Sequence, residues 1–483
     1  TEIKNIENLD TSGCTNMYAM FNNCYNLTSV DVSHFDTSHV KDFGNMFGMC
    51  RNLTAIDVSH FDTSNATTMW NMFAGCNKLT SLNVSNFNTS KCTDMQWMFN
   101  ACGELTELDV SNFDTSNVTT MAWMFARCVK LTKLDLSNFD TKNVKTMYCM
   151  FAYDSNLTTL NISNFTTNNV TNMNSMFNNC KKLTSINLSK FNTSNVIDMA
   201  SMFDQCVALK SLDVSAFNTS KVVNMQQMFE GCLGLTTIKG LESFDTKNVM
   251  NMSRMFSNGE NYTGSGKLTN LQVANWDTSK VQDMTCMFYG QGQQTTLDIS
   301  KWNVSSCTSF NHMFTDNHKL QALDLSKWNT HNVKTIYNIF DDCYALTTLG
   351  DISHWDTSNM VDIGGFINGC KSFVGDNGTL DLSSWDTSHI LAMGEMFRAC
   401  SSLKTIDLSG WNTSSVINGK WEGTGSGIYY TFGNDTSGFE GMCQMFKDCK
   451  GLEHVYVGSG WNTAGKHITN MFTGANISAV SQK

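Results

Sequence analysis

The sequence contains no proline in its 483 residues, and charged residues make up only 16% of it. Because proline supplies no amide hydrogen to a ladder, its absence favours a fold with backbone hydrogen bonds along most of its length. The net charge of −11 comes without basic clusters, which argues against nucleic acid as a partner. No stretch approaches the roughly 18 apolar residues of a transmembrane helix. We therefore expect no membrane span here, and we expect any leader peptide or anchor to lie outside this sequence.

Motifs of catalysis and metal binding are also missing from the sequence. It has no nucleophile elbow, no phosphate-binding loop, no HExxH pair and no CxxC pair. Repeated columns of side chains offer many identical environments, whereas catalysis needs a singular one. We therefore predict that the protein is not an enzyme, and that it has neither a metal site nor a cofactor.

What the sequence does contain is one repeat that recurs every 26 residues. Phe73, Phe99 and Phe125 illustrate this spacing, and a methionine precedes each of them. The series continues through the chain with small insertions, giving about seventeen units. Such strict self-similarity predicts a single solenoid over residues 1–483, in which each unit stacks on its neighbours to bury a shared core.

Each unit divides into two halves. In the unit at residues 105–130, Leu108 and Val110 alternate with polar neighbours, as in a short strand. After a turn of the type SNFDTSN, Val118, Met121 and Phe125 recur at three-to-four-residue spacing, which suits a short helix or 3-10 segment. The predicted fold class is therefore an α/β repeat solenoid, similar to leucine-rich repeats, with one continuous parallel sheet and short helical segments.

Methionine and cysteine concentrate in columns of this repeat. The 30 methionines lie mostly in the two Met columns of the MxxMF segment, where core filling is favoured over an adaptable binding surface. Twelve of the 18 cysteines follow the MF phenylalanine by three residues: Cys24, Cys50, Cys76, Cys102, Cys128, Cys180, Cys206, Cys232, Cys343, Cys370, Cys400 and Cys449. Neighbours in this column are close enough for disulfides, but parallel side chains fit the disulfide torsion poorly, so a ladder of buried, reduced thiols is favoured.

The pattern LTxLDxSxFDTSxVxxMxxMFxxC, seen from Leu79 to Cys102, resembles the BspA-like leucine-rich-repeat family of microbial surface proteins. The resemblance covers essentially the whole chain. It implies an extracellular location on the cell surface and a role in adhesion to host matrix or to other cells. It brings no catalytic residues.

Small polar side chains form a grid on the predicted sheet face. Threonine precedes each strand and aspartate recurs within it, as in the following positions: Thr28, Asp31, Thr54, Asp57, Thr106 and Asp109. A second acidic column follows the turn aromatic, from Asp36 to Asp386. We favour Asx-turns, in which each carboxylate accepts backbone amides, over calcium held between rungs, because calcium needs about six to eight oxygen ligands.

Departures from the repeat are the other candidate binding features. The largest is an insertion at residues 418–440, expected to be a projecting hairpin or loop because it lacks the repeat's columns. Its Trp421, Tyr429, Tyr430 and Phe432 either bind a partner or pack on the solenoid. Smaller insertions lie at residues 257–266, with Tyr262, and at residues 371–378.

Two classes of function fit these observations. In the first, the protein is a non-catalytic adhesin that binds a protein or glycan of another cell or of the matrix. In the second, it is a structural subunit of an extracellular filament or surface layer, because open ends of a parallel sheet expose unpaired backbone that favours self-association. A dispersed monomer in solution supports the first class, and ordered polymers support the second.

Overall fold

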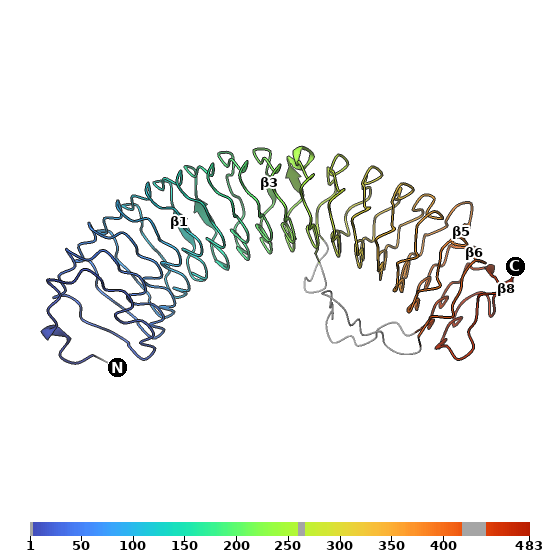
Figure 1. The fold of residues 1–483 in the computed structure, drawn as a ribbon, viewed down its shortest axis with the longest axis horizontal. Helices are drawn as coiled ribbons and strands as arrows, with labels where there is room; N and C mark the ends of the chain where they lie inside the picture. Colours follow the sequence, from blue (N-terminus) through green and yellow to red (C-terminus); the bar gives the residue numbers. More distant parts are fainter. Residues whose placement is uncertain (1–2, 259–265, 418–440) are drawn as a thin grey trace. The chain divides into compact units, whose positions relative to one another are not determined.

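The computed structural model describes residues 3–258, 266–417 and 441–483. The chain forms two compact units, residues Thr1–Phe244 (unit 1) and Asp245–Lys483 (unit 2). Within each unit, successive repeats stack as rungs whose equivalent residues pair in parallel (Figure 1). The predicted parallel solenoid is thus confirmed for each unit.

Regular secondary structure is sparse in both units. Unit 1 contains the 3-10 helices η1 (Ile6–Asn8) and η2 (Leu241–Ser243) and the strands β1 (Lys133–Asp135), β2 (Thr159–Asn161), β3 (Ser211–Asp213) and β4 (Thr237–Lys239). Unit 2 contains β5 (Thr379–Asp381), β6 (Thr405–Leu408), β7 (His454–Val457) and β8 (Ser481–Gln482). All named strand pairs are parallel: β1 with β2, β3 with β4, and β5 to β8 in sequence order.

The MxxMF segment forms the most regular hydrogen-bonded column, although it is neither a helix nor a named strand. Its backbone amides donate alternately to a carbonyl of the next rung and to a carbonyl of their own rung. The Phe99 amide donates to the Met124 carbonyl of the next rung at 3.0 Å, whereas the Met98 amide donates to Met95 within its own rung at 3.2 Å. Almost every amide of the segment is therefore bonded, which fits the complete absence of proline.

The expected helical segment is not formed, and the described residues contain no α-helix. The reason lies in two left-handed backbone positions, four residues apart, in almost every MxxMF segment. Examples are Trp97 with φ of 63° and Ala101 with φ of 57°. A residue in the left-handed region cannot continue a right-handed helix, so each turn is broken after three residues. Valine and methionine still point inward at the predicted spacing.

The predicted continuous sheet is also only partly present. Leu108 and Val110 are buried and Asp109 is exposed, so the in-out alternation of a strand is kept. Most of these strand-like segments form only one or two backbone hydrogen bonds with a neighbouring rung. An example is the bond of 3.1 Å from the Thr54 amide to the Thr28 carbonyl. Ladders long enough to be strands occur only at β1–β8 among the described residues.

Stacked rings and methionines fill the core. In unit 1, the Phe99 ring lies 6.1 Å from that of Phe73 and 5.8 Å from that of Phe125, with nearly parallel planes. These rings and the adjoining Met95 and Met98 have no exposed surface. The interpretation of the Met columns as core is confirmed, because each rung alone would leave this apolar face in water.

The cysteine column is a ladder of free thiols. None of the 18 cysteines forms a disulfide in the structure, and all except Cys14 and Cys24 are buried. From Cys50 onward, each column thiol donates to the carbonyl of the MF residue in the preceding rung, as from Cys102 Sγ to the Phe73 oxygen at 3.2 Å. At the equivalent position of unit 2, the Asn317 amide makes the same bond to Phe288 at 2.7 Å. Most positions of the column therefore hold a small hydrogen-bond donor. The predicted burial of the ladder is confirmed, and its reduced state stays a prediction.

Several tryptophans of the turn column in unit 2 also act as donors, although the indole nitrogen of Trp328 has no partner among the described residues. Trp302 and Trp411 are buried, and their indole nitrogens donate to Val273 and Leu382 of the preceding rungs at 3.1 and 2.8 Å. In unit 1 the turn aromatic is Phe, and the equivalent carbonyl of Val84 accepts from the neighbouring Asn112 amide at 3.2 Å. Where Trp replaces Phe in this way, the backbone carbonyl of the preceding rung accepts its hydrogen bond from the indole instead of from an asparagine side chain.

Candidate functional site

The sheet-face grid predicted from the sequence is exposed but committed to local bonds. Asp31, Asp57 and Asp109 are exposed, and each accepts the amide two residues later, as Asp109 does from Ser111 at 2.9 Å. Hydrogen bonds from the serine side chain and amide lower the pKa of each carboxyl. Thr28, Thr54 and Thr106 are exposed as well.

The second acidic column forms the predicted Asx-turns. Asp36 accepts the Ser38 amide and Asp386 accepts the Ser388 amide, both at 2.9 Å. Within the described parts of the chain, no three His, Cys, Asp or Glu side chains come together in a way that could hold a metal ion.

Several predicted site residues lie outside the described residues. These are Tyr262 and the residues of the insertion at 418–440, namely Trp421, Tyr429, Tyr430 and Phe432. The insertion at 371–378 is described, and its end forms an antiparallel bridge in which Asp376 and Thr379 exchange backbone bonds of 2.8 and 2.9 Å.

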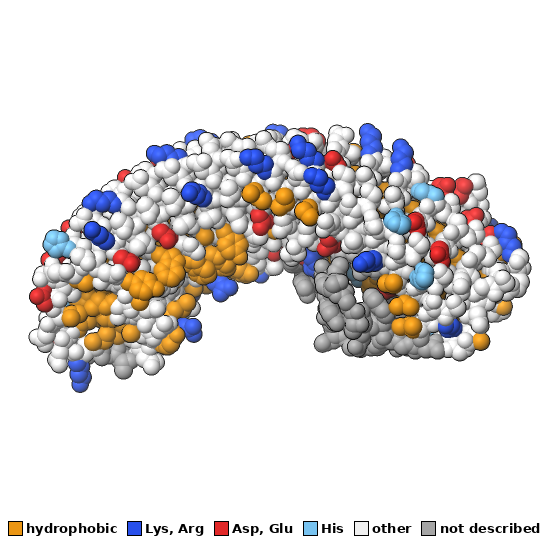
Figure 2. All heavy atoms as spheres, in the orientation of Figure 1, with side chains coloured by type: hydrophobic (Ala, Val, Ile, Leu, Met, Phe, Trp, Pro, Cys, Tyr) orange, Lys and Arg blue, Asp and Glu red, His pale blue; other side chains and the backbone are white. Residues whose placement is uncertain are grey.

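The structure instead brings together a row of aromatic side chains along one rim of unit 1. We call this row the aromatic strip: Tyr18, Trp70, Trp97, Trp123, Tyr148 and Tyr153. Tyr18 is 52% exposed, Tyr148 37% and Tyr153 41%, and the three tryptophans are partly exposed. Figure 2 shows hydrophobic side chains gathered on a face of this unit. Exposed aromatic residues gathered on one unit in this way are a mark of interaction sites.

Rings of the strip stack on one another from rung to rung. Trp97 and Trp123 have ring centroids 4.7 Å apart and planes within 14° of parallel, and Tyr148 meets Trp123 edge-on at 5.7 Å. Tyr18 and Trp70 stack at 6.4 Å across the intervening Gly44. A Cβ at Gly44 would stand 3.2 Å from the Tyr18 ring, so glycine leaves room for this pair.

Arg127 adds a cation to the strip. Its guanidinium lies 5.9 Å from the centroid of Trp123 and 5.2 Å from that of Tyr153, over both rings. Such cation–π contacts hold the arginine in place while its remaining donors stay available to a partner. Trp, Tyr and Arg are the residue types that dominate binding energy at protein interfaces.

The strip was not predicted from the sequence, because the predicted sites were the insertions and the columns that repeat. The signal was nevertheless present. At the position that follows the first Met of MxxMF by two residues, other rungs place Asn71, Ser175 or Gln227, whereas two adjacent rungs place tryptophan. That position has left-handed backbone, with φ of 59° at Trp123, which is costly for a bulky side chain. An aromatic residue at a strained surface position is a feature that core packing does not require.

The family model described as "Mycoplasma protein of unknown function, DUF285" matches residues 1–103, 78–184, 152–268, 262–379 and 345–421. The chain belongs to this family. No curated protein matches the chain.

Solved structures of leucine-rich-repeat proteins are similar at low identity. A leucine-rich repeat protein from Bacteroides ovatus is 13% identical, with 95% of this chain and 79% of that chain covered and a TM-score of 0.29. A leucine rich cell surface protein from Faecalibacterium prausnitzii is 15% identical, with 81% and 74% covered and a TM-score of 0.23. An internalin from Listeria monocytogenes is 14% identical, with 70% and 82% covered and a TM-score of 0.21. Similarity at this level carries no functional information.

Helices that could cross a bilayer are absent from residues 3–258, 266–417 and 441–483, none of which forms a helix of sufficient length and hydropathy.

Proposed function

We propose that this protein is a non-catalytic binding protein of the microbial cell surface, an adhesin whose aromatic strip contacts a protein partner. The surface location and the adhesive role rest on the resemblance to the BspA-like family. The single observation that carries the binding proposal is the strip itself, six aromatic side chains and Arg127 exposed together on unit 1.

The stacking of the rings favours a protein over a glycan as the partner of the strip. A sugar needs the free face of an aromatic ring, but Trp97 and Trp123 turn one face toward each other at 4.7 Å. Their outer edges offer instead an irregular apolar surface, against which the apolar side chains of a protein pack well.

The test is binding of the purified chain to immobilised fibronectin, laminin, fibrinogen and collagen, measured by surface plasmon resonance. We expect W97A and W123A each to weaken binding by about tenfold or more, as for interface hot spots. M250A is the control, because Met250 is an exposed hydrophobic residue, 44% accessible, that belongs to unit 2 and is not a member of the strip. It should bind like the parent.

Three outcomes contradict the proposal. The first is a parent chain that binds none of these proteins. The second is a pair of folded tryptophan variants that bind as tightly as the parent. The third is a parent that forms dimers or polymers, shown by light scattering, which W123A disperses; the strip would then be a self-association surface.

A further inference from the structure

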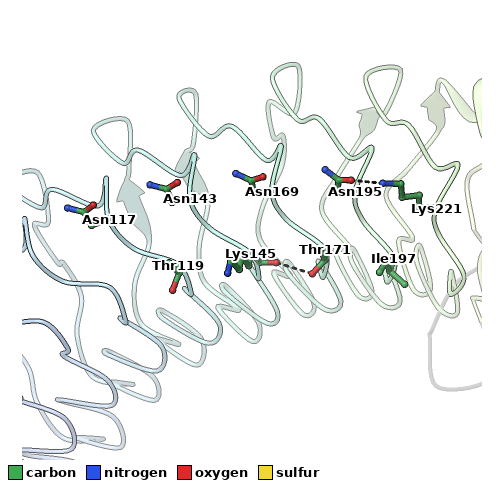
Figure 3. Close-up of a pocket in the computed structure, with 9 residues that line it drawn as sticks. All are labelled: Asn117, Thr119, Asn143, Lys145, Asn169, Thr171, Asn195, Ile197 and Lys221. Atoms are coloured by element: carbon green, nitrogen blue, oxygen red, sulfur yellow. Dashed lines mark hydrogen bonds between the residues drawn. The ribbon is translucent and has the colours of Figure 1, made fainter.

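A second surface of unit 1 has a different chemistry from the strip. A shallow groove of about 780 Å³ runs along several rungs, and its walls are two rows of side chains (Figure 3). One row is Asn117, Asn143, Asn169 and Asn195, and the other is Thr119, Lys145, Thr171 and Ile197, with Lys221 at one end. Neither row was identified as a site from the sequence.

The asparagine row is held in a fixed orientation. The Nδ2 atoms of Asn143 and Asn169 donate to the backbone carbonyls of Ser116 and Lys142 in the preceding rungs, both at 2.7 Å. Asn117 makes the equivalent bond at 2.8 Å. Because Nδ2 is committed to the backbone, each Oδ1 is left as an oriented acceptor, repeated once per rung at roughly 4.8 Å, the spacing of paired strands.

The chain itself shows what these acceptors bind. Where the row ends in lysine instead of asparagine, the ammonium takes the Oδ1 of the preceding asparagine. Lys221 Nζ lies 2.6 Å from Asn195 Oδ1, and Lys91 Nζ lies 2.7 Å from Asn65 Oδ1. Between these ends, no donor from the described residues is recorded on the Oδ1 atoms of Asn117, Asn143 and Asn169, so these three are open to donors of a ligand.

The opposite row contributes a cation and an apolar contact. Thr119 and Thr171 donate their hydroxyls to the backbone, the latter to the Lys145 carbonyl at 3.2 Å. The Lys145 ammonium belongs to an exposed side chain, and Ile197 is 46% exposed. None of the nine lining residues is acidic. The groove thus combines oriented acceptors, a positive charge and a small apolar surface.

We infer that this groove binds a linear, acidic polysaccharide that lies along the rungs. Sugar hydroxyls rotate to donate to each Asn Oδ1, carboxylate or sulfate groups pair with Lys145, and a C–H face covers Ile197. An extended peptide fits less well, because its amides on one side recur at about 6.6 Å, twice the rise of a strand residue, and so fall out of step with the rungs.

This inference goes beyond the protein-binding strip, since it assigns a second class of ligand to other residues of the same unit. The probes are an oligoguluronate, a heparin oligosaccharide, a neutral cello-oligosaccharide and a single-stranded oligonucleotide, titrated calorimetrically into the full chain. We expect the two acidic oligosaccharides to bind, and we expect binding to weaken with added salt.

Two substitutions and one control test the two rows separately. K145Q removes the charge and should weaken binding of the acidic oligosaccharides about fivefold, the range of an exposed charge pair. The double variant N143D/N169D keeps the shape of the row but places negative charge in it, so it should weaken the same binding by more than tenfold. K133Q changes an exposed lysine of β1, outside the groove, and should bind like the parent.

The inference is overturned if neither acidic oligosaccharide binds, or if the folded groove variants bind as the parent does. It is equally overturned if K133Q weakens binding as much as K145Q, which would show diffuse charge attraction. Stronger binding of the neutral oligosaccharide or of the oligonucleotide would also contradict it. Since the aromatic strip is intact in these variants, binding to matrix proteins reports on the strip independently.

Discussion

Trp97 and Trp123 lie one rung apart, and their rings stack with centroids separated by 4.7 Å. The Trp97 amide donates to the Ala122 carbonyl at 2.9 Å, so the backbone ladder sets the distance between the two residues. The solenoid therefore builds the stack, and the two side chains should stabilise each other.

We expect a double-mutant cycle of W97A and W123A to give a coupling of about 1 kcal/mol, the usual value for an aromatic pair. The measurement is the free energy of unfolding in urea. Combining W97A with Y25A is the control, because Tyr25 lies in a different rung and contacts Arg51 instead. That pair should be additive within about 0.5 kcal/mol, and equal coupling in both cycles would contradict a specific stack.

Asp154 interrupts the cysteine ladder, and this makes a prediction about pH. It is fully buried, its Oδ1 accepts the Cys128 amide at 2.8 Å, and its Oδ2 has no partner among the described residues. Burial raises the pKa of this carboxyl well above its ordinary value of 3.8. The folded state thus keeps a proton that the unfolded state loses, so stability is full below about pH 4 and declines as the pH rises.

The variants D154N and D154C should remove this decline. From pH 4 to pH 7 the parent should lose stability at up to about 1.4 kcal/mol per pH unit, whereas neither variant carries a group at this position that ionises differently between the two states in that range. The variants should therefore be more stable than the parent at pH 7, with a smaller difference at pH 4. Urea midpoints at four pH values check this, and a difference independent of pH would contradict it.

Much of this fold follows from the sequence, because the 26-residue period places the same residue types in contact with themselves. Leu108 and Val110 are buried as expected, as are the Met and Cys columns. The backbone between Met121 and Cys128 could not be predicted in the same way. Its side-chain spacing is that of a helix, but the amides bond to the next rung, and left-handed residues make this arrangement possible. Periodicity reports which side chains face inward, not which carbonyl an amide selects.

The aromatic strip was missed for a related reason. Its members occupy three columns that hold small or polar residues in most rungs, so no single column shows the pattern. Only the stacking of rungs reveals that Trp123, Tyr148 and Arg127 lie together. The sheet-face grid shows the reverse case, since its members were easy to find but are held in local bonds.

The left-handed positions predict opposite effects of two substitutions. A101G should raise the free energy of unfolding by about 0.5 kcal/mol, because Ala101 has φ of 57° and glycine relieves that strain at some entropic cost. G75A should lower it by at least about 1 kcal/mol, because Gly75 has φ of 73°. Its added Cβ would also stand 2.6 Å from the Met49 sulfur. Urea unfolding of both variants checks this, and changes of the same sign would contradict the backbone account.

The thiol ladder predicts a large difference between native and denatured reactivity. After denaturation without reductant, titration with a thiol reagent should find most of the 18 cysteines free. In the native state only Cys14 and Cys24 should react quickly, since they alone are partly exposed. The others are buried, and burial raises the pKa of Cys92, for example, to about 12, which suppresses the reactive thiolate. Detection of only a few thiols in the denatured protein would show disulfides instead.

The last prediction concerns removal of residues 418–440, the insertion that remains a proposed binding loop. The residues on either side of it belong to one rung. The Ile417 amide donates to Leu391 at 3.1 Å, and the Met393 amide donates to Gly441 at 3.1 Å. Joining Ile417 to Gly441 gives the order Ile417, Gly441, Met442.

This order matches an uninterrupted rung of unit 1, in which Ile197, Asp198 and Met199 follow one another. The deletion should therefore leave the melting temperature within a few degrees of the parent value, since the rung keeps its length and its buried columns. If Trp421, Tyr429 and Tyr430 bind a partner, the deletion variant should lose affinity for matrix proteins although its aromatic strip is unchanged. The W123A variant tests the strip separately. A deletion variant that folds and binds as tightly as the parent would show that the insertion takes no part in binding, and one that fails to fold would show that residues 418–440 support the rung.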